Sequence, residues 1–249
     1  MEDYTIAEEF ELPSKGKVYQ TEVNPNVKLR SMTTEEEMKR LGHSPYVYKM
    51  FSEMIDNCLV EKPGISAYDL CLGDYQYLLY KLRIVTYGPD YMVQVNCPSC
   101  GEFDKVSINL DSLEVNTYKD SFDKLMEFEL PVSKKIVKIK LQTPRILDEV
   151  DKESRAQNSK TSESVESALL FNVMSIIDTV DGIELDDTKK EIFVRHLPMR
   201  DTNIILQKEK KLVNSIGINT TIKCKCSHCG YERDEILPFT GEFFRPSVD

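Results

Sequence analysis

Two short cysteine motifs constrain the fold of this chain more than any other feature of its sequence. The segment "CPSCG" begins at Cys97, and the segment "CSHCG" begins at Cys226. In each motif, here called a knuckle, two thiolates flank a tight turn, and the glycine after them tolerates the positive φ that the turn requires. Two knuckles together supply the four thiolates of a closed structural zinc site. The sequence therefore predicts one zinc ion, with these ligands: Cys97, Cys100, Cys226 and Cys229.

Two further potential ligands lie beside the second knuckle, Cys224 and His228. Before the first knuckle, Val93 and Val95 alternate with polar residues as in a strand, and Cys224 occupies the place of Val95 in the second copy. We therefore expect Cys224 to be a small buried hydrophobic residue. His228 falls inside the turn, where we expect it to face solvent. The alternative is a site that uses Cys224 or His228 in place of a knuckle cysteine.

A redox dithiol and a catalytic zinc ion are the alternative functions for such motifs. A redox Cys-x-x-Cys pair normally opens a helix within a βαβ pattern, whereas strand-like alternation runs through both knuckles here. A catalytic zinc ion keeps one coordination position open and usually has histidine or carboxylate ligands. Four thiolates leave no open position, so the pattern favours a structural ion.

The order of the motifs along the chain indicates an internal duplication. The segment "FELP" begins at Phe10 and again at Phe128, and each copy precedes a hairpin, helices, a knuckle and a closing strand. Asp74 and Asp201 lie at similar places ahead of the two knuckles, and both are predicted helix N-caps. One shared match has little weight, but the same order of all of them is typical of a repeated unit.

The predicted fold is therefore α+β and internally duplicated, with helices and short antiparallel strands. The first repeat covers residues 8–117 and the second covers residues 126–249, and the shared zinc site joins them into one compact unit. Residues 151–164 contain almost no apolar side chain, which predicts a mobile loop or a frayed, solvated helix end. Thr33 and Glu36 have the spacing of a helix capping box.

The composition narrows the classes of partner. With 42 acidic against 32 basic residues, the formal net charge is −10, which favours protein partners over nucleic acids. No run reaches the roughly 18 apolar residues that a membrane helix needs. The acidic N-terminal segment lacks the pattern of a signal peptide, so a cytoplasmic location with reduced thiols is expected.

The sequence contains no recognisable catalytic motif. Its three histidines, His43, His196 and His228, are not paired with a nucleophile in any known motif, and the ten glycines form no phosphate-binding loop. We therefore expect a protein that is not an enzyme. A zinc ribbon that binds nucleic acid is a further alternative, but it requires clustered basic and aromatic residues, which the sequence does not show.

Four segments carry a resemblance to a known family: "LPSKGKVY", "LRSMTTEEEMKRLG", "LGDYQYLLYKLRIVTYGPDY" and "VNCPSCGE". They resemble the baseplate hub proteins of T-even-type contractile-tailed bacteriophages, most strongly over residues 10–110 and more weakly through the second knuckle. The resemblance implies a late viral protein of the host cytoplasm with phage baseplate hub proteins as partners and no enzymatic reaction. It implies a chaperone-like assembly factor that promotes formation of the central hub; a permanent structural subunit of the hub is the alternative.

Overall fold

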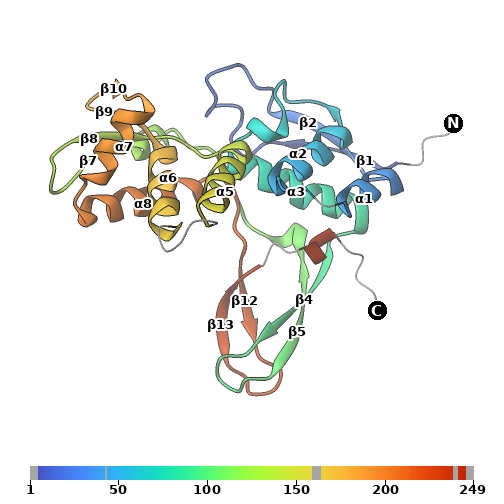
Figure 1. Cartoon of the computed structure of the whole chain (residues 1–249). Coiled ribbons are helices and arrows are strands. Elements are labelled where there is room, and N and C mark those ends of the chain that lie inside the picture. Colours follow the sequence, from blue (N-terminus) through green and yellow to red (C-terminus); the bar gives the residue numbers. More distant parts are fainter. Residues whose placement is uncertain (1–4, 43, 159–163, 238–240, 245–249) are drawn as a thin grey trace.

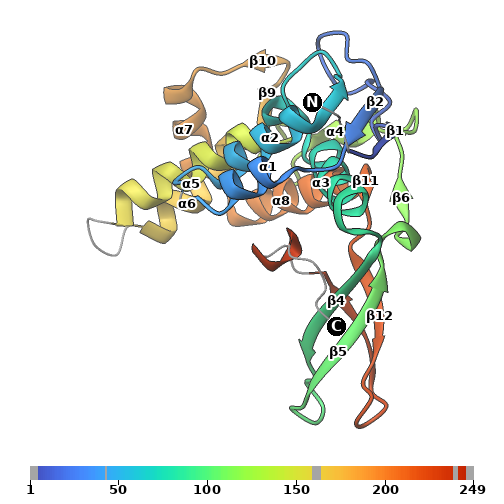
Figure 2. The same cartoon turned by 90° about the vertical axis from the view of Figure 1, so that its right-hand side faces the viewer.

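The computed structural model describes residues 5–42, 44–158, 164–237 and 241–244 and shows a mixed α+β fold. Figure 1 and Figure 2 show a body of helices and small sheets, from which an arm of β-strands projects. The arm comprises residues 90–109 and 221–236, and the body comprises the other described residues. Within the described part of the chain, no helix is long and apolar enough to cross a membrane.

The described residues contain eight α-helices joined by short strands. The helices are α1 (Thr34–Arg40), α2 (Val47–Cys58), α3 (Leu72–Tyr87), α4 (Asp123–Met126), α5 (Pro144–Asn158), α6 (Ser164–Ile176), α7 (Asp187–Arg195) and α8 (Met199–Val213). The strands of the body are β1 (Ala7–Glu11), β2 (Asn26–Arg30), β3 (Leu59–Glu61), β6 (Val115–Asn116), β7 (Glu127–Glu129), β8 (Ile136–Ile139), β9 (Ile177–Val180), β10 (Ile183–Glu184) and β11 (Gly217–Ile218). The strands of the arm are β4 (Asp90–Asn96), β5 (Phe103–Asn109), β12 (Thr221–Lys225) and β13 (Glu232–Ile236).

Two antiparallel sheets of the body follow the same path. One has the order β1-β2-β3 and the other has the order β10-β9-β8-β7. Phe10 lies opposite Val27 in the first sheet, and Phe128 lies opposite Val137 in the second. Both β2 and β8 show a register shift just after these valines, where each pairs with its third strand. The two "FELP" segments therefore begin sheets whose first three strands follow the same order and share a local irregularity, and the second sheet adds β10.

A buried aspartate ties the turn after the first "FELP" segment to α3. Asp74 is the third residue of this helix and Cys71 is its N-cap, so the predicted N-cap role of Asp74 is wrong. The Asp74 carboxylate instead accepts hydrogen bonds from the Ser14 backbone N–H at 2.9 Å, from the Ser14 hydroxyl, and from the Tyr19 hydroxyl at 2.7 Å. Its side chain is fully buried, so these bonds replace the water that the carboxylate loses.

The second aspartate makes the corresponding contact in α8. Asp201 is the third residue of α8 and Pro198 is the N-cap, so the N-cap prediction is wrong here too. The carboxylate accepts hydrogen bonds from the backbone N–H groups of Val132, at 2.9 Å, and Ser133, at 2.8 Å. Each aspartate thus holds the turn that follows a "FELP" segment.

Replacement of Asp74 by alanine is expected to lower the free energy of unfolding by about 3 kcal/mol, because it leaves buried donors without a partner. Urea denaturation measures this loss. The matched control is Asp187→Ala, an exposed aspartate in the first turn of α7, for which a change within about 0.5 kcal/mol is expected. Equal stability of the two variants would show that the Asp74 contacts do not support the fold.

Two hydrophobic cores lie in the body. The first is built around α2, α3 and the β1-β2-β3 sheet, and the second is built around α6, α8 and the other sheet. Fully buried apolar residues of the first core include Leu12, Leu29, Ile55, Leu70, Leu78 and Leu82. Those of the second core are Leu130, Val137, Ile139, Val173, Ile176, Ile177, Ile205 and Leu212.

The end of the chain returns to the first core. The last described turn, Gly241–Phe244, places two fully buried phenylalanines against α2 and α3. The Phe244 ring stacks on Phe51 with 5.6 Å between centroids, and the Phe243 ring lies 4.7 Å from that of Tyr80. The first core therefore contains side chains from both ends of the sequence.

The two cores meet at a backbone contact between α3 and β11. A Cβ added to Gly73 would lie 2.5 Å from the carbonyl oxygen of Ile216, and one added to Gly217 would lie 2.8 Å from the Cα of Gly73. Gly217 also has a φ of +105°, which disfavours any side chain. Beside this contact, the Leu72 backbone N–H donates to the Gln142 carbonyl at 3.1 Å. The close approach requires glycine on both sides.

Helix α5 forms a second junction between the cores. The Asp148 carboxylate accepts hydrogen bonds from the backbone N–H groups of Tyr48, at 3.3 Å, and Lys49, at 2.8 Å. These are unpaired N–H groups of the first turn of α2, whose N-cap makes no side-chain bond of its own. Arg145 donates two hydrogen bonds to Asp69, at 2.7 Å and 2.9 Å. Asp148 of α5 therefore caps α2, although the two helices lie far apart in the sequence.

The predicted loop at 151–164 is only partly a loop. Residues 151–158 are the last turns of α5, and Ser164 begins α6. Residues 159–163 lie outside the described residues. The capping box predicted for Thr33 and Glu36 is confirmed at the start of α1, where the Glu36 carboxylate accepts from the Thr33 N–H at 2.8 Å.

Candidate metal centre

Two β-hairpins form the arm, and each knuckle is the turn of one hairpin. Strand β4 alternates exposed and buried residues along its whole length, with Tyr91, Val93 and Val95 on the buried side. This alternation is the period-2 pattern of a strand with one covered face. The β12–β13 hairpin lies beside the β4–β5 hairpin, so both knuckles lie at the far end of the arm (Figure 2).

The two knuckles have the same backbone structure. The Gly101 N–H donates to the Cys97 carbonyl at 2.8 Å, and the Gly230 N–H donates to the Cys226 carbonyl at 2.9 Å. The φ angles of these glycines are +76° and +74°, as the turn geometry predicted. Because the turns match, they present their cysteines in the same way.

The four knuckle cysteines form one cluster. All four sulfur atoms lie within 4.8 Å of one another, and the cysteines are free thiols. The Sγ atoms of Cys97 and Cys229 are 3.6 Å apart, and those of Cys100 and Cys226 are 3.8 Å apart. A tetrahedral centre with metal–sulfur bonds of about 2.3 Å separates its sulfurs by about 3.8 Å. The cluster therefore has the dimensions to hold one metal ion.

One thiol of the cluster is prepared for metal binding. Backbone N–H groups of Cys100 and Ser99 point at the Cys97 sulfur and lower the pKa of the Cys97 thiol to about 6. The thiolate is the form that binds a metal ion. At neutral pH this residue can therefore bind an ion without first paying the full cost of deprotonation.

Cys224 and His228 are not part of the cluster of sulfur atoms. Cys224 lies in β12 opposite Arg233, and its side chain is buried. Burial raises the pKa of the Cys224 thiol, which disfavours the thiolate there. His228 lies in the turn of the second knuckle and is exposed. Among the described residues the cluster consists of the four knuckle cysteines, and their role as metal ligands stays a prediction.

Two side chains hold the hairpins together beside the cluster, and the sequence analysis missed both. Asp104 of β5 accepts hydrogen bonds from the Ser227 backbone N–H, at 2.8 Å, and from the Ser227 hydroxyl, at 2.9 Å. These bonds hold the pKa of Asp104 below its ordinary value. From the second hairpin, Arg233 of β13 donates to the Asn96 carbonyl of the first hairpin at 3.2 Å. The sequence contains one signal for the role of Asp104, because Asp104 is a charged residue at an inward position of an alternating strand.

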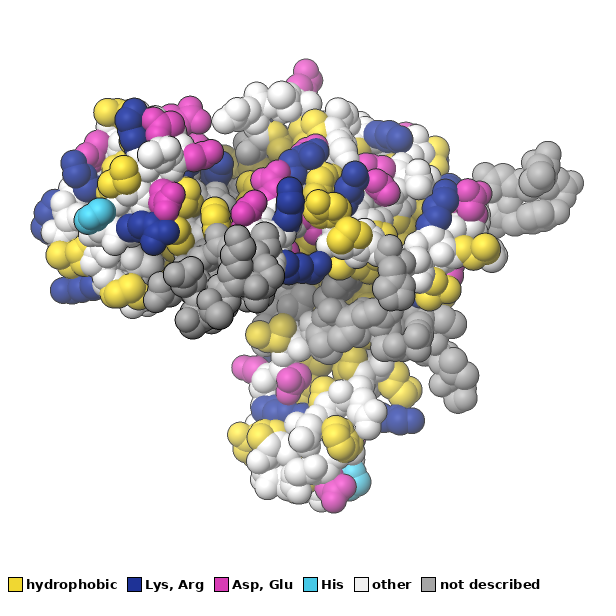
Figure 3. Space-filling view, viewed as in Figure 1, with side chains coloured by type: hydrophobic (Ala, Val, Ile, Leu, Met, Phe, Trp, Pro, Cys, Tyr) yellow, Lys and Arg dark blue, Asp and Glu magenta, His cyan; other side chains and the backbone are white. Residues whose placement is uncertain are grey.

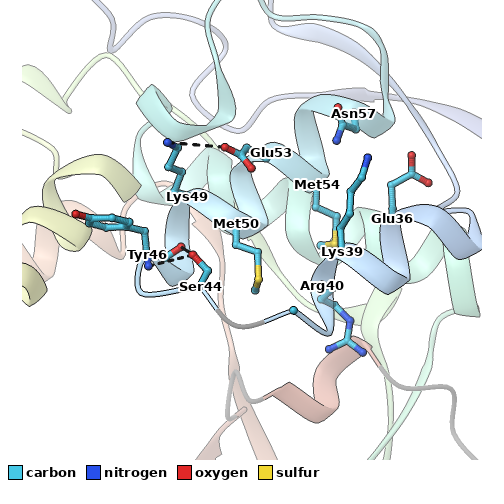
Figure 4. Close-up of a pocket in the computed structure, with 11 residues that line it drawn as sticks. Glu36, Lys39, Arg40, Ser44, Tyr46, Lys49, Met50, Glu53, Met54 and Asn57 are labelled. Atoms are coloured by element: carbon cyan, nitrogen blue, oxygen red, sulfur yellow. Dashed lines mark hydrogen bonds and ion pairs between the residues drawn. The ribbon is translucent and has the colours of Figure 1, made fainter.

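A separate hollow lies between α1 and α2, and Figure 4 shows its lining. Its volume is about 330 Å³, and its lining includes Glu36, Lys39, Arg40, Ser44, Tyr46, Lys49, Met50, Glu53, Met54 and Asn57. The Ser44 hydroxyl already accepts from the Tyr46 N–H at 3.1 Å. The pKa of Glu36 falls to about 2 in spite of its burial, because Arg30 and Thr33 donate hydrogen bonds to it. Among its described lining residues there is no histidine or cysteine that could act as a base or nucleophile.

The described side chains on the face in Figure 3 form no patch of a single charge sign. Basic and acidic side chains are interspersed there, and apolar side chains appear between them. The exposed large apolar residues are distributed over both halves and the arm; examples are Ile6, Met38, Leu41, Phe103, Ile183, Ile192, Met199 and Ile236. Among the described residues visible on this face, basic side chains do not gather into a groove for a phosphate backbone.

Comparison with known proteins identifies a family. No curated protein and no solved structure matches the chain. A match to the family described as T4 bacteriophage base plate protein covers residues 4–245, nearly the whole chain, including both halves and both knuckles. This agrees with the resemblance carried by the four sequence segments. The chain therefore belongs to the T4 bacteriophage base plate protein family.

Proposed function

We propose that this protein is a non-enzymatic, chaperone-like factor that promotes formation of the central hub of a contractile phage tail baseplate. Membership in the baseplate family is the observation that carries this proposal. The dispersed exposed apolar residues support reversible contacts, since a permanent subunit usually presents a broad apolar patch. The charged, mixed surface favours fast and reversible association with baseplate hub proteins.

A permanent structural subunit of the hub is the second candidate. The projecting arm supports it, because an arm of this kind can reach between neighbouring subunits. Quantitative mass spectrometry of purified baseplates separates the two functions. Absence from finished baseplates is expected for the assembly factor, and a fixed whole-number ratio to the hub proteins would establish the structural subunit. Normal hub formation in a phage lacking this gene would contradict both functions.

We propose further that the protein works in the host cytoplasm and binds no nucleic acid. The net charge of −10 and the lack of a basic patch on the face in Figure 3 support this. A gel-shift titration with DNA and RNA at two salt concentrations tests it. Salt-dependent binding at micromolar protein would favour the zinc-ribbon alternative instead.

We propose that the four-cysteine cluster binds zinc and that the ion is structural. Four thiolates in a tetrahedral arrangement are the donor set that zinc prefers in closed sites. The ion would cross-link the tips of two hairpins that come from different halves of the sequence. The knuckles lie in β-hairpins rather than at the start of a helix, which disfavours a redox dithiol.

Loss of the Asp104 contact is expected to weaken zinc binding about tenfold in the Asp104→Ala variant, because groups that orient the ligands tune metal affinity. The Asp104 carboxylate fixes Ser227, which directly follows the ligand Cys226. Competition with a chromophoric chelator measures the affinity. Asp234→Ala, an exposed aspartate of β13, is the matched control and is expected to bind zinc as the wild type does. The same affinity in both variants would contradict the role of Asp104.

We infer that the two halves are repeats of one ancestral unit. The shared sheet order, the paired register shifts, the two buried aspartates and the matching knuckles support this. Superposition of β1–β3, α3 and the first hairpin on β7–β9, α8 and the second hairpin tests it. Phe10 is expected to fall on Phe128, and Asp74 on Asp201; unrelated positions would leave the shared order a coincidence.

A further inference from the structure

A groove of about 410 Å³ lies along one side of the arm, between β5 and β12. Ser107 and Asn109 of β5 line one wall, and Lys223 of β12 lines the other. Figure 2 shows the two strands side by side. Glu114 and Asn219 lie at the end nearest the body, where the Asn219 N–H donates to the Glu114 carbonyl at 2.8 Å. The groove is therefore closed at the end nearest the body, and its lining on β5 extends as far as Val106.

The wall formed by β5 presents main-chain groups that the hairpin does not use. Pro89 and Leu110 are the next pair after the β4–β5 ladder, and the Leu110 N–H donates to the Pro89 carbonyl. This bond identifies which pairs of the ladder are hydrogen-bonded. In an antiparallel pair only every second residue exchanges hydrogen bonds with its partner strand, and the others turn their N–H and C=O groups outward. Lys105 and Ser107 are outward residues in this phase. Within the described part of the chain, neither has a main-chain hydrogen bond on that side.

Strand β12 presents a similar edge across the groove. Thr220 and Leu237 are the next pair after the β12–β13 ladder, and the Leu237 N–H donates to the Thr220 carbonyl. Counting along β12 from this hydrogen-bonded pair makes Lys223 an outward residue as well. The groove is thus bordered by two strand edges of one kind. Side chains of a segment that pairs with one edge would lie against the other.

Two lysines add a charge to these edges. Lys105 and Lys223 are exposed, and neither forms an ion pair within the described residues. By contrast, the neighbouring Lys225 is paired with Glu232 at 2.9 Å. Lysines on an open edge often serve only to prevent aggregation. Here Lys223 lines the groove, and Lys105 directly precedes the lining residue Val106 on β5. Two lysines without an ion pair among the described residues therefore offer positive charge to acidic side chains.

We propose that the β5 edge of this groove binds an extended, acidic segment of another baseplate protein by strand addition. The segment's main chain would hydrogen-bond to Lys105 and Ser107, and its acidic side chains would lie near Lys105 and Lys223. Main-chain pairing supplies affinity in such complexes, and the alternate side chains supply specificity. The proposal rests on the proposed function, because it assigns the surface through which the protein contacts a baseplate component.

The test compares matched variants of the full-length protein against the individually purified baseplate proteins of the same phage. Ser107→Pro removes an outward N–H that the β4–β5 ladder does not use, so the hairpin is expected to form. Ser107→Ala keeps that N–H and is the control. A second variant, Lys105→Glu with Lys223→Glu, reverses the charge and leaves the main chain intact. Metal content and thermal unfolding verify that each variant is folded.

The expected result is one baseplate protein that binds the wild type and slows amide hydrogen exchange at Lys105 and Ser107. Its affinity should fall at least about tenfold with Ser107→Pro and with the charge reversal, and stay unchanged with Ser107→Ala. Two results would overturn the strand-addition surface and leave the proposed function intact. One is binding without protection of these amides, and the other is wild-type affinity in both disruptive variants. If the same amides become protected when the protein is concentrated without a partner, the edge pairs with a second copy of the chain. That result would also overturn the proposal. Failure of every baseplate protein to bind the wild type would overturn the proposed function itself.

Discussion

Replacement of Cys226 by serine is expected to abolish tight zinc binding and to separate the two hairpins of the arm. The residue supplies one of four clustered sulfurs, and its partner sulfur on Cys100 is 3.8 Å away. Structural zinc contributes about 10–16 kcal/mol in small folded units, which equals or exceeds the total stability of about 5–15 kcal/mol of a typical domain. Metal analysis of the purified variant and hydrogen exchange across the arm measure the loss. The second core of the body, which lies outside the arm, is expected to stay protected.

Cys224→Val is the matched control for this prediction. Cys224 is a buried neighbour of the cluster, and valine fills a similar apolar position without a sulfur. The variant is expected to retain one zinc ion per chain and the exchange pattern of the wild type. If Cys224→Val lost zinc while Cys226→Ser kept it, the ligand set would have to be reassigned.

Replacement of Phe243 by alanine is expected to lower the free energy of unfolding by about 3–5 kcal/mol, the range for large-to-small changes in a packed core. The Phe243 ring is fully buried and contacts Tyr80 at 4.7 Å and Tyr91 at 5.3 Å between centroids. Its loss leaves a cavity between α3 and β4, at the junction of body and arm. Chemical denaturation monitored by tyrosine fluorescence measures the change.

Phe103→Ala is the control for the aromatic substitution. Phe103 is 63% exposed in the arm, so its removal should change the stability by no more than about 0.5 kcal/mol. A loss below about 1 kcal/mol for Phe243→Ala would mean that the C-terminal turn is only loosely attached to the first core.

The clustering of the four knuckle cysteines could be predicted from the sequence because its information is local. Each Cys-x-x-Cys-Gly segment determines its own turn, and the presence of two such segments implies a shared ion. The capping box of Thr33 and Glu36 was predictable for the same reason, since its hydrogen bonds join residues three positions apart. Such patterns need no knowledge of the tertiary fold.

The roles of Asp74, Asp201 and Asp148 could not be predicted in this way. Asp74 and Asp201 occupy the first turns of helices, where aspartate is common, but their partners lie 55 to 69 residues earlier in the chain. Asp148 caps a helix that lies about 100 residues away in the sequence. The position of an aspartate near a helix start indicates its local propensity, whereas the identity of its donors depends on the packing of the two cores.

The return of the C-terminal turn to the first core has a consequence for synthesis on the ribosome. Helices α2 and α3 are complete early, but Phe243 and Phe244, which fill the space beside them, are synthesised long after these helices. At about 5–20 residues per second, translation from residue 117 to residue 243 takes roughly 6–25 s. For that interval the nascent first half carries an open apolar surface, and a chain that terminates before Gly241 never closes it. Synthesis through Phe244 is therefore a physical condition for maturation of the first half.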